Sequence, residues 1–188
     1  MRGPRLILAS GSPRRARILG TLGLKFLIRP SDVDETITRG ESPRAAVKRL
    51  ALRKVREGFR RPEDAVIAAD TVVAVRGRIL GKPASEREAR AMLRRLSGRS
   101  HQVVTGMAVS RNGKVVSALD LTEVRFRRMT GREIGAYVRS GEPMDKAGAY
   151  HIDGAGAAFI EWIKGSPSNV AGLSVTTARR LLRKVGFS

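Results

Sequence analysis

The stretch LILASGSPRRAR, residues 6–17, sets the pattern from which the rest of the chain can be interpreted. Its apolar start, residues 6–9, predicts a short buried strand, and the three small residues that follow predict a loop. Ser12 is a typical helix N-cap, and Pro13 suits the first helical position, where its missing N–H costs nothing. A strand, a loop and a helix N-terminus are therefore expected in immediate succession.

Two arginines, Arg14 and Arg15, fall in the first turn of this predicted helix. Free backbone N–H groups, the positive end of the helix dipole and two guanidinium groups together favour a bound anion such as phosphate. The alternative is an ordinary solvated helix start, where arginines are slightly unfavourable against the dipole. The spacing alone leaves both interpretations open, although a bound anion would offset the unfavourable placement.

The composition predicts one folded domain over residues 1–188, large enough for a substantial core, with an unusual net charge of +20. A nucleic-acid partner is one explanation of this charge, and dispersed charge on solvated helix faces is the other. We favour dispersed charge, because basic residues and aromatic residues are not interleaved. The basic residues are instead spread over helical segments such as 44–61, 87–99 and 179–184.

Cysteine is absent, which excludes disulfides and thiolate chemistry. No apolar run approaches the length of about 20 residues that a membrane-spanning helix needs, and none resembles the core of a signal peptide. The sequence therefore predicts a cytoplasmic protein without a membrane partner.

Further along the chain, apolar runs alternate with helical patterns. Strands are expected near residues 24–28, 65–69, 71–75, 102–110, 114–119, 123–127 and 157–164. Helices are expected after Ser42-Pro43, after Ser85, after Thr130 and over residues 176–185. Asn112-Gly113 is a strong hairpin signal between two of the strands. The order predicts a mixed α/β protein with both parallel and hairpin pairings.

Asp70 is the strongest candidate for chemistry, because it directly follows five apolar residues and is expected at the C-terminal end of a buried strand. A carboxylate there can hold a divalent metal or act as a general base, although a turn aspartate that only satisfies local N–H groups is as plausible. Lys82 could contact a phosphate or be a solvated loop lysine. The loop acids Asp32, Asp34 and Glu35 could supply metal oxygens or be merely exposed.

Other classes of site find little support. His101 and His151 are isolated histidines without the spacing of metal ligands. The chain contains no phosphate-binding P-loop, dinucleotide fingerprint or catalytic triad pattern. The candidate residues share one feature, which is that they all suit a metal-bound polyphosphate.

Several motifs resemble one family over nearly the whole chain. They are LILASGSPRR, DVDET, ESPRAAVKRLALRKVRE, AADTVV, ILGKP, MLRRLSGRSHQVVTG and SGEPMDKAGAYHIDG, and their order and spacing are those of Maf-family nucleoside triphosphate pyrophosphatases. The resemblance implies an elongated mixed sheet with flanking helices, two lobes around a central cleft, and a homodimer. It also implies that a nucleoside triphosphate and water give a nucleoside monophosphate and pyrophosphate, with Mg²⁺ or Mn²⁺ as cofactor.

The same resemblance assigns roles to individual residues. It implies that Asp70 is catalytic and that Asp70 and Glu35 hold the metal. It implies substrate specificity at Arg14, Thr71 and Asp153. The residues that it places against the phosphates are Ser10, Ser12, Arg14, Arg15, Lys54 and Lys82.

Two segments depart from the family pattern and concern the base rather than the phosphates. Pyrimidine-preferring members usually have Gln in an IQG sequence, where this chain has Asp153, and Pro167 replaces an aromatic residue. DKAGAY at residues 145–150 still favours the dTTP/UTP branch, with modified nucleotides as further substrates. The alternatives are the 7-methyl-GTP branch, a triphosphatase that attacks the γ-phosphate, and a basic nucleic-acid-binding protein without catalysis.

Overall fold

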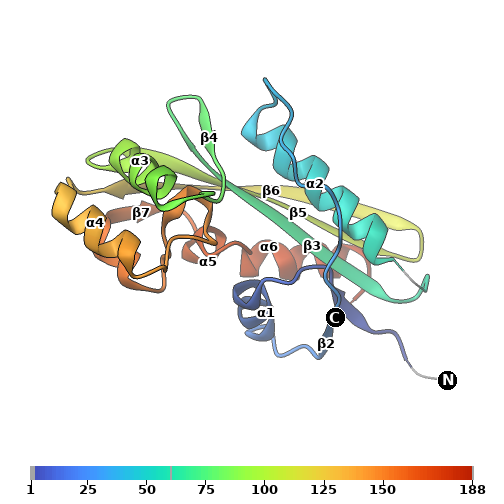
Figure 1. The fold of residues 1–188 in the computed structure, drawn as a ribbon. Helices are drawn as coiled ribbons and strands as arrows, with labels where there is room; N and C mark the ends of the chain where they lie inside the picture. Colours follow the sequence, from blue (N-terminus) through green and yellow to red (C-terminus); the bar gives the residue numbers. More distant parts are fainter. Residues whose placement is uncertain (1–2, 60, 188) are drawn as a thin grey trace. The chain divides into compact units, whose positions relative to one another are not determined.

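The computed structural model describes residues 3–59 and 61–187, and Figure 1 shows a mixed α/β fold. The strands are β1 (Leu6–Leu8), β2 (Phe26–Ile28), β3 (Ala65–Val75), β4 (Arg78–Leu80), β5 (Ser100–Arg111), β6 (Lys114–Phe126) and β7 (Ile160–Lys164). The α-helices are α1 (Pro13–Gly20), α2 (Pro43–Gly58), α3 (Glu86–Leu96), α4 (Gly131–Arg139), α5 (Pro167–Val170) and α6 (Val175–Lys184). Two 3₁₀ turns cover Ala147–Ala149 and Ala155–Phe159.

Within the described ranges the strands form one seven-stranded sheet in the order β2-β1-β3-β5-β6-β7, with β4 on β3. β1 pairs in parallel with both β2 and β3, while β3 pairs antiparallel with β4 and β6 with β7. Asn112 and Gly113 both have positive φ in the two-residue turn between β5 and β6, as a tight hairpin requires. The predicted α/β class with a mixed sheet and flanking helices is confirmed.

The chain divides into two compact units. The first contains the described residues up to Asp70, 105–120 and those from Gly172 on, and the second contains Thr71–Val104 and Leu121–Ala171. The second unit has a single buried cluster around Phe126, Leu93 and Tyr150.

The first unit has a core on each face of its strands. Alternate residues of β1 and β3 belong to different clusters, as the two-residue period of a strand demands. Leu6 and Leu8 pack with side chains of α1 and α6, whereas Ile7 packs with side chains of α2. Accordingly, α2 lies on one side of these strands and α1 and α6 on the other (Figure 1).

A glycine sets the distance between α2 and the sheet. A Cβ atom at Gly106 in β5 would lie 2.3 Å from the carbonyl oxygen of Val47 in α2. Such a contact is far inside van der Waals range, so only glycine allows the helix backbone to pack directly on the strand. The buried residues of α2 include the apolar side chains of Ala46, Leu50 and Val55, which recur with helical spacing.

Two strand predictions need correction. Asp70 lies inside β3 rather than at its end, because Val73–Val75 continue the strand by pairing with β4. The strands expected at 114–119 and 123–127 are one strand, β6, which runs through Asp120 without a break. The half-exposed residues of this strand carry no continuous apolar signal, so hydrogen bonding to the neighbouring strands, rather than local pattern, maintains it.

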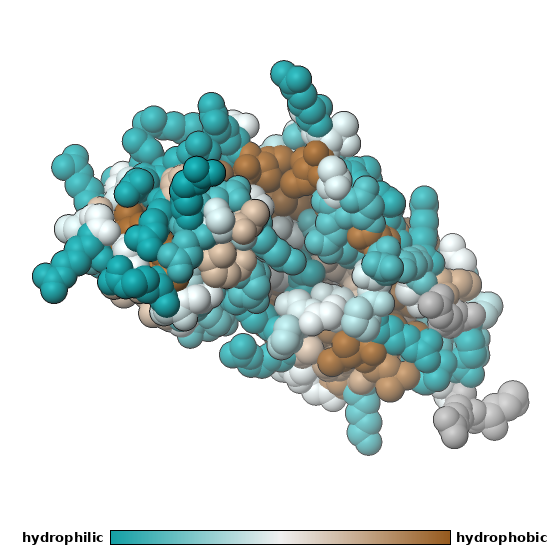
Figure 2. All heavy atoms as spheres, in the orientation of Figure 1, coloured by the Kyte–Doolittle hydropathy of each residue, from teal (hydrophilic) through white to brown (hydrophobic). Residues whose placement is uncertain are grey.

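No helix in the described part of the chain is long and apolar enough to cross a bilayer. Hydrophilic side chains cover much of the face shown in Figure 2, in keeping with the net charge of +20.

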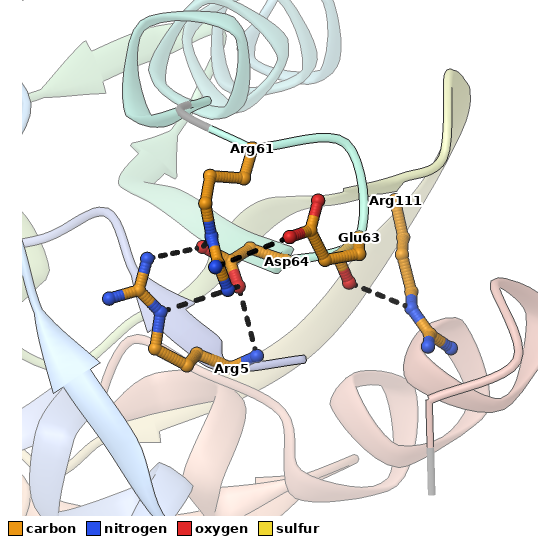
Figure 3. Close-up of polar contacts among 5 residues, drawn as sticks. All are labelled: Arg5, Arg61, Glu63, Asp64 and Arg111. Carbon is orange, nitrogen blue, oxygen red and sulfur yellow. Dashed lines mark hydrogen bonds and ion pairs between the residues drawn. The ribbon is translucent and has the colours of Figure 1, made fainter. Parts of the chain in front are cut away.

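A buried aspartate ties the start of β1 to the start of β3. Asp64 is fully buried and accepts hydrogen bonds from the backbone N–H of Arg5 at 3.0 Å, from Arg5 Nη2 at 2.8 Å and from Arg61 Nη2 at 3.0 Å. Figure 3 shows both guanidinium groups converging on this carboxylate. Burial raises the pKa of Asp64, but the hydrogen bonds from Arg5 and Arg61 outweigh it and hold the pKa well below its ordinary value.

We predict that Asp64→Asn lowers the free energy of unfolding by about 2 kcal/mol, the value of hydrogen bonds to a charged group. The loss stays below that of a fully buried pair, because Arg5 and Arg61 are 31% and 37% exposed and regain water. Glu63→Gln, at a half-exposed neighbour, serves as the control and is expected to change stability by less than about 0.5 kcal/mol.

Denaturant unfolding at several pH values measures the effect of Asp64→Asn. Because the native pKa of Asp64 is depressed, the unfolded state binds the proton first, so the carboxylate stabilises the fold above its ordinary pKa of 3.8. The difference between wild type and variant is therefore constant near neutral pH and shrinks as the pH falls below about 4. A difference that does not depend on pH would contradict this account.

Candidate functional site

The loop between β1 and α1 has the geometry that its sequence predicts. The Ser12 side chain caps α1 by accepting from the backbone N–H of Arg15, and Pro13 occupies the first turn. Ser10 is buried, and its Oγ accepts from the backbone N–H of Ser12 at 3.2 Å and from Arg15 Nη1 at 3.3 Å. Arg15 Nε donates to the carbonyl oxygen of Gly172 at 2.9 Å. The guanidinium is thus folded onto the loop instead of extending into solvent.

Charges on neighbouring elements act on this guanidinium. Burial lowers the pKa of Arg15, the negative charges of Asp70 and Glu35 oppose that effect, and the positive charge of Arg14 adds to it. The loop therefore places the half-buried Arg15 within electrostatic reach of two carboxylates. Binding of an anion by this loop stays a prediction.

Lys54 forms the centre of the site. Its Nζ lies 2.6 Å from Asp70 Oδ1 and 2.6 Å from Glu35 Oε1. The side chains of Lys54 and Asp70 are 3% and 10% exposed, whereas that of Glu35 is 51% exposed. One buried ammonium thus joins a helix, a strand and a loop that are far apart in the sequence.

The position of Lys54 corrects a sequence interpretation. The helical pattern of α2 assigns Lys54 to the exposed face with Lys48, Arg49, Arg53 and Arg56, but Lys54 is buried. Only the family resemblance singled it out. The physical reason is Asp70, whose carboxylate lies in the largely apolar strand β3 and offsets the burial of the ammonium.

A divalent metal fits this pair of carboxylates. Asp70 and Glu35 both lie within hydrogen-bonding distance of one nitrogen, so their oxygens converge on a small region. The described residues contain no group of three or more acids or histidines that could hold a metal by themselves. Mg²⁺ suits such an arrangement, because it is commonly held by one or two carboxylates together with water and substrate phosphates.

Side chains of α2 also hold the loop that carries Glu35. Arg49 donates to both carboxylate oxygens of Glu41, at 2.8 and 2.7 Å, and to the carbonyl oxygen of Thr36 at 3.1 Å. Arg53 donates to the carbonyl oxygen of Asp34 at 3.3 Å. Glu57 accepts from the backbone N–H of Asp32 at 2.9 Å.

Sequence reasoning missed these three positioning residues, because it placed Arg49 and Arg53 on a solvated face and did not single out Glu57. Their spacing of four residues, at 49, 53 and 57, places them on one side of a helix and was the available signal. The hydrogen bond from Arg49 lowers the pKa of Glu41, and the hydrogen bonds from Thr36 lower that of Asp34. The Asp34 carboxylate thus serves the loop's own geometry by accepting from the backbone N–H of Thr36 at 2.9 Å, whereas Glu35 contacts Lys54.

The remaining predicted site residues belong to the second unit. Thr71 follows Asp70 in β3 and is half-buried, Lys82 is exposed after β4, and Asp153 is exposed with its Oδ2 4.0 Å from His151 Nε2. Their approach to the cluster around Lys54 stays a prediction.

Glu142 organises the segment that carries Asp153. Its carboxylate accepts from the hydroxyl of Tyr137 at 2.8 Å and from the backbone N–H groups of Ala155 and Gly156, both at 3.1 Å. Burial raises the pKa of Glu142, but these hydrogen bonds outweigh it and the net shift is downward. This carboxylate was not singled out in the sequence, where it is simply one acid in a glycine-rich stretch.

His101 lies in the buried interior of the second unit and not at a candidate site. His101 is buried, its Nε2 lies 2.9 Å from the hydroxyl of Tyr150, and its ring meets those of Phe126 and Tyr150 edge-on. Burial lowers the pKa of His101 to about 4 and raises that of Tyr150, so both are neutral near pH 7.

The first unit thus has an α/β fold with two features of a candidate site. One is the loop before α1, which carries Arg14 and Arg15, and the other is the buried Lys54 ammonium, which contacts the carboxylates of Asp70 and Glu35. The chain belongs to the Maf family, since the family model described as Maf-like protein matches residues 5–185.

Curated relatives match over the full length. The chain is 50% identical to the dTTP/UTP pyrophosphatase of Anaeromyxobacter dehalogenans strain 2CP-C, over 98% of this chain and 95% of that protein. It is 49% identical to the dTTP/UTP pyrophosphatase of Thermococcus onnurineus, over 97% of this chain and 98% of that protein.

Among solved structures, the Ham1 protein of Staphylococcus aureus matches with a TM-score of 0.47 and 17% identity, over 65% of this chain and 71% of that one. A nucleoside-triphosphatase/dITP/XTP pyrophosphatase from Mycobacterium abscessus matches with a TM-score of 0.43 and 16% identity, over 96% and 94%.

We predict that Arg49→Gln releases the loop that carries Glu35. Arg49 holds the Glu41 carboxylate, which in turn accepts from the backbone N–H of Thr38 at 3.1 Å. Hydrogen exchange at the Thr38 amide should therefore accelerate on the order of tenfold, which corresponds to the loss of about one hydrogen bond. Lys48→Gln removes the same charge from an exposed neighbouring position and is the control. Equal exchange rates in the two variants would show that Arg49 does not hold the loop.

Proposed function

We propose that this protein is a nucleoside triphosphate pyrophosphatase that hydrolyses dTTP and UTP to the nucleoside monophosphate and pyrophosphate. The names of full-length relatives at about 50% identity support the substrate class. The observation that carries the mechanism is the buried ammonium of Lys54, held 2.6 Å from the carboxylates of both Asp70 and Glu35.

The loop before α1 binds the phosphate chain in this proposal. Ser10 and Arg15 are already fixed to one another, so the loop loses little freedom when an anion arrives. The Ser12 hydroxyl and the Arg14 guanidinium supply further donors, and the positive end of the α1 dipole favours the anion. Lys82 of the second unit adds a compact positive charge, as the family resemblance implies.

Asp70 acts as the general base for the attacking water in this proposal. Its Oδ1 accepts the hydrogen bond from Lys54, which fixes the plane of the carboxylate. Its Oδ2 is the oxygen that we assign to accept a proton from water as the water attacks the α-phosphorus. Lys54 prevents Asp70 and Glu35 from repelling one another while both remain ionised.

A divalent cation, Mg²⁺ or Mn²⁺, would be held by Asp70 and Glu35. When bound, it would neutralise the triphosphate and polarise the α-phosphorus. The guanidinium groups of Arg14 and Arg15 stabilise the negative charge that develops on the departing pyrophosphate, mainly by electrostatics and orientation. The homodimer that the resemblance implies stays a prediction, which light scattering tests.

Identification of the products of dTTP hydrolysis tests the proposed function. We expect dTMP and pyrophosphate in the presence of Mg²⁺, and Asp70→Asn should lower kcat by about 10²-fold or more because the amide cannot accept the proton. Asp120→Asn, at a half-buried acid elsewhere in the first unit, is the control and should retain activity.

The product pattern separates the alternatives. Release of dTDP and phosphate would instead identify a triphosphatase that attacks the γ-phosphate. An Asp70→Asn variant with a normal melting curve and near wild-type turnover would refute the role of Asp70.

A second prediction concerns the base. An ionised Asp153 can only accept hydrogen bonds, whereas glutamine both donates and accepts, as O4 and N3–H of thymine or uracil require. A carboxylate suits guanine, which offers two donors. We therefore expect hydrolysis of dTTP and UTP, with weaker discrimination against GTP-like or modified nucleotides than an amide would give. Asp153→Gln should raise kcat/KM for dTTP and UTP relative to GTP by roughly tenfold. Glu161→Gln, at another exposed acid of the second unit, is the control. If Asp153→Gln ranks the nucleotides as the wild type does, Asp153 does not contact the base.

A further inference from the structure

A hollow of about 740 Å³ lies on the first unit between α6 and the turn that follows α1. Four cations of α6 line it, Arg179, Arg180, Arg183 and Lys184, together with uncharged residues that include Thr21 and Leu22. No carboxylate contributes to this lining. The hollow shares no residue with the cluster around Lys54.

The positive charge of this hollow is not balanced within the described part of the chain. Arg179 and Arg183, and likewise Arg180 and Lys184, are four residues apart and therefore neighbours on the helix surface, where like charges repel. None of the four forms an ion pair with a described carboxylate, and Arg180 Nη2 donates to Thr177 Oγ1 at 3.5 Å. A bound anion would relieve this repulsion.

Capping of α6 does not account for these cations. Lys114 Nζ donates to the carbonyl oxygen of Lys184 at 2.6 Å, and Arg111 donates to the carbonyl oxygens of Val185 and Gly186. The carbonyl oxygen of Arg183 accepts from the backbone N–H of Gly186 at 3.0 Å. Because two cations of the β5–β6 hairpin already meet the negative end of the helix dipole, the side chains of Arg183 and Lys184 remain available for a ligand.

The surroundings indicate what kind of anion fits. Cations four residues apart are separated by about 6 Å along a helix, so the two rows can contact successive groups of an extended polyanion. A smaller hollow of about 140 Å³ adjoins the first, shares Leu22, Arg179 and Arg183 with it, and is otherwise lined by apolar residues, among them Phe187. Phosphate-binding cations next to an apolar and aromatic surface are characteristic of proteins that bind single-stranded nucleic acids.

We propose that this basic hollow binds the backbone of a single-stranded nucleic acid, with its phosphates on the four cations of α6 and a base against the adjoining apolar surface. The sequence argued against such a partner because basic residues were spread along the chain. Four of them lie within residues 179–184, and the tertiary structure adds a hollow that all four line. The binding is independent of base sequence, because phosphate contacts carry no sequence information.

Fluorescence polarisation with a labelled twelve-residue oligothymidylate tests the proposal. Replacing Arg179, Arg180, Arg183 and Lys184 with Gln should weaken binding at 50 mM salt by at least about tenfold. The slope of log K against log salt should fall in magnitude by about 3, since each phosphate contact to a single strand contributes about 0.7.

A matched control removes the same total charge from exposed positions of the second unit, by replacing Arg87, Arg94, Arg95 and Arg132 with Gln. This variant should change the affinity by less than about threefold. An equal loss of affinity in both variants would show that only net charge matters and would overturn the proposal. Unchanged affinity in both variants would also overturn it. Thermal melts verify that both variants fold, and loss of the repulsive pairs should leave the Tm of the α6 variant unchanged or higher.

Two further probes distinguish a single-stranded nucleic acid from a duplex and from a short phosphate chain. A twelve-base-pair duplex that binds more tightly than the single strand, through the same four residues, would overturn the role of the apolar surface. Displacement of the oligonucleotide by an equimolar amount of inorganic tripolyphosphate would show that the site takes a short phosphate chain and would also overturn the proposal. We expect tripolyphosphate to compete only in large excess, because it cannot span both rows of cations and contacts no apolar surface.

Discussion

The contact between the Lys54 ammonium and the Asp70 carboxylate is the interaction on which the site depends. An isolated ionised carboxylate inside an apolar strand, or an isolated ammonium under a helix, would be strongly unfavourable. Together they offset one another, and Glu35 brings a third charge from a loop. The contact needs α2 close to the sheet, and Gly106 allows this because its missing Cβ leaves room for the Val47 carbonyl. A backbone detail of β5 thus determines the geometry of a cluster that contains no residue of β5.

Arginine has several distinct roles in this strongly basic chain. Arg5 and Arg61 neutralise the buried Asp64 and fasten the beginnings of two neighbouring strands. Arg49 and Arg53 hold the loop that carries Glu35. Arg15 is folded onto its own loop, where it donates to Ser10 Oγ and to the carbonyl oxygen of Gly172. The planar guanidinium suits all of these roles, because it can donate several hydrogen bonds in fixed directions.

The division of the chain into two units separates the tasks that the family resemblance combines. The first unit contains the anion loop, the ammonium and both carboxylates, and therefore the groups that can act on a phosphate chain. The second unit contains Asp153 on a segment that the Glu142 carboxylate holds by accepting three hydrogen bonds, from Tyr137, Ala155 and Gly156. The cluster around Lys54 and the segment that carries Asp153 are thus supported by different cores.

The sequence by itself determined the elements and several of their ends. Ser12, Ser42 and Thr130 are N-caps as predicted, the apolar stripe of α2 is buried, and Asn112-Gly113 turns the β5–β6 hairpin. These features depend on local chemistry, which is visible over a few residues. The identity of the candidate residues came from motifs, and their contacts could not be derived from local pattern.

Tertiary structure alone decided which charges are buried and which groups meet. Local periodicity placed Lys54 on a solvated face, because nothing nearby in the sequence shows that Asp70 stands opposite it. The same limit concealed the roles of Arg49, Arg53 and Glu57, whose partners lie on a loop up to 25 residues away. It also concealed the hollow beside α6, where the turn after α1 joins the four cations of residues 179–184. The physical reason is that burial and electrostatics depend on distances in space, and those distances are set by how helices and strands pack.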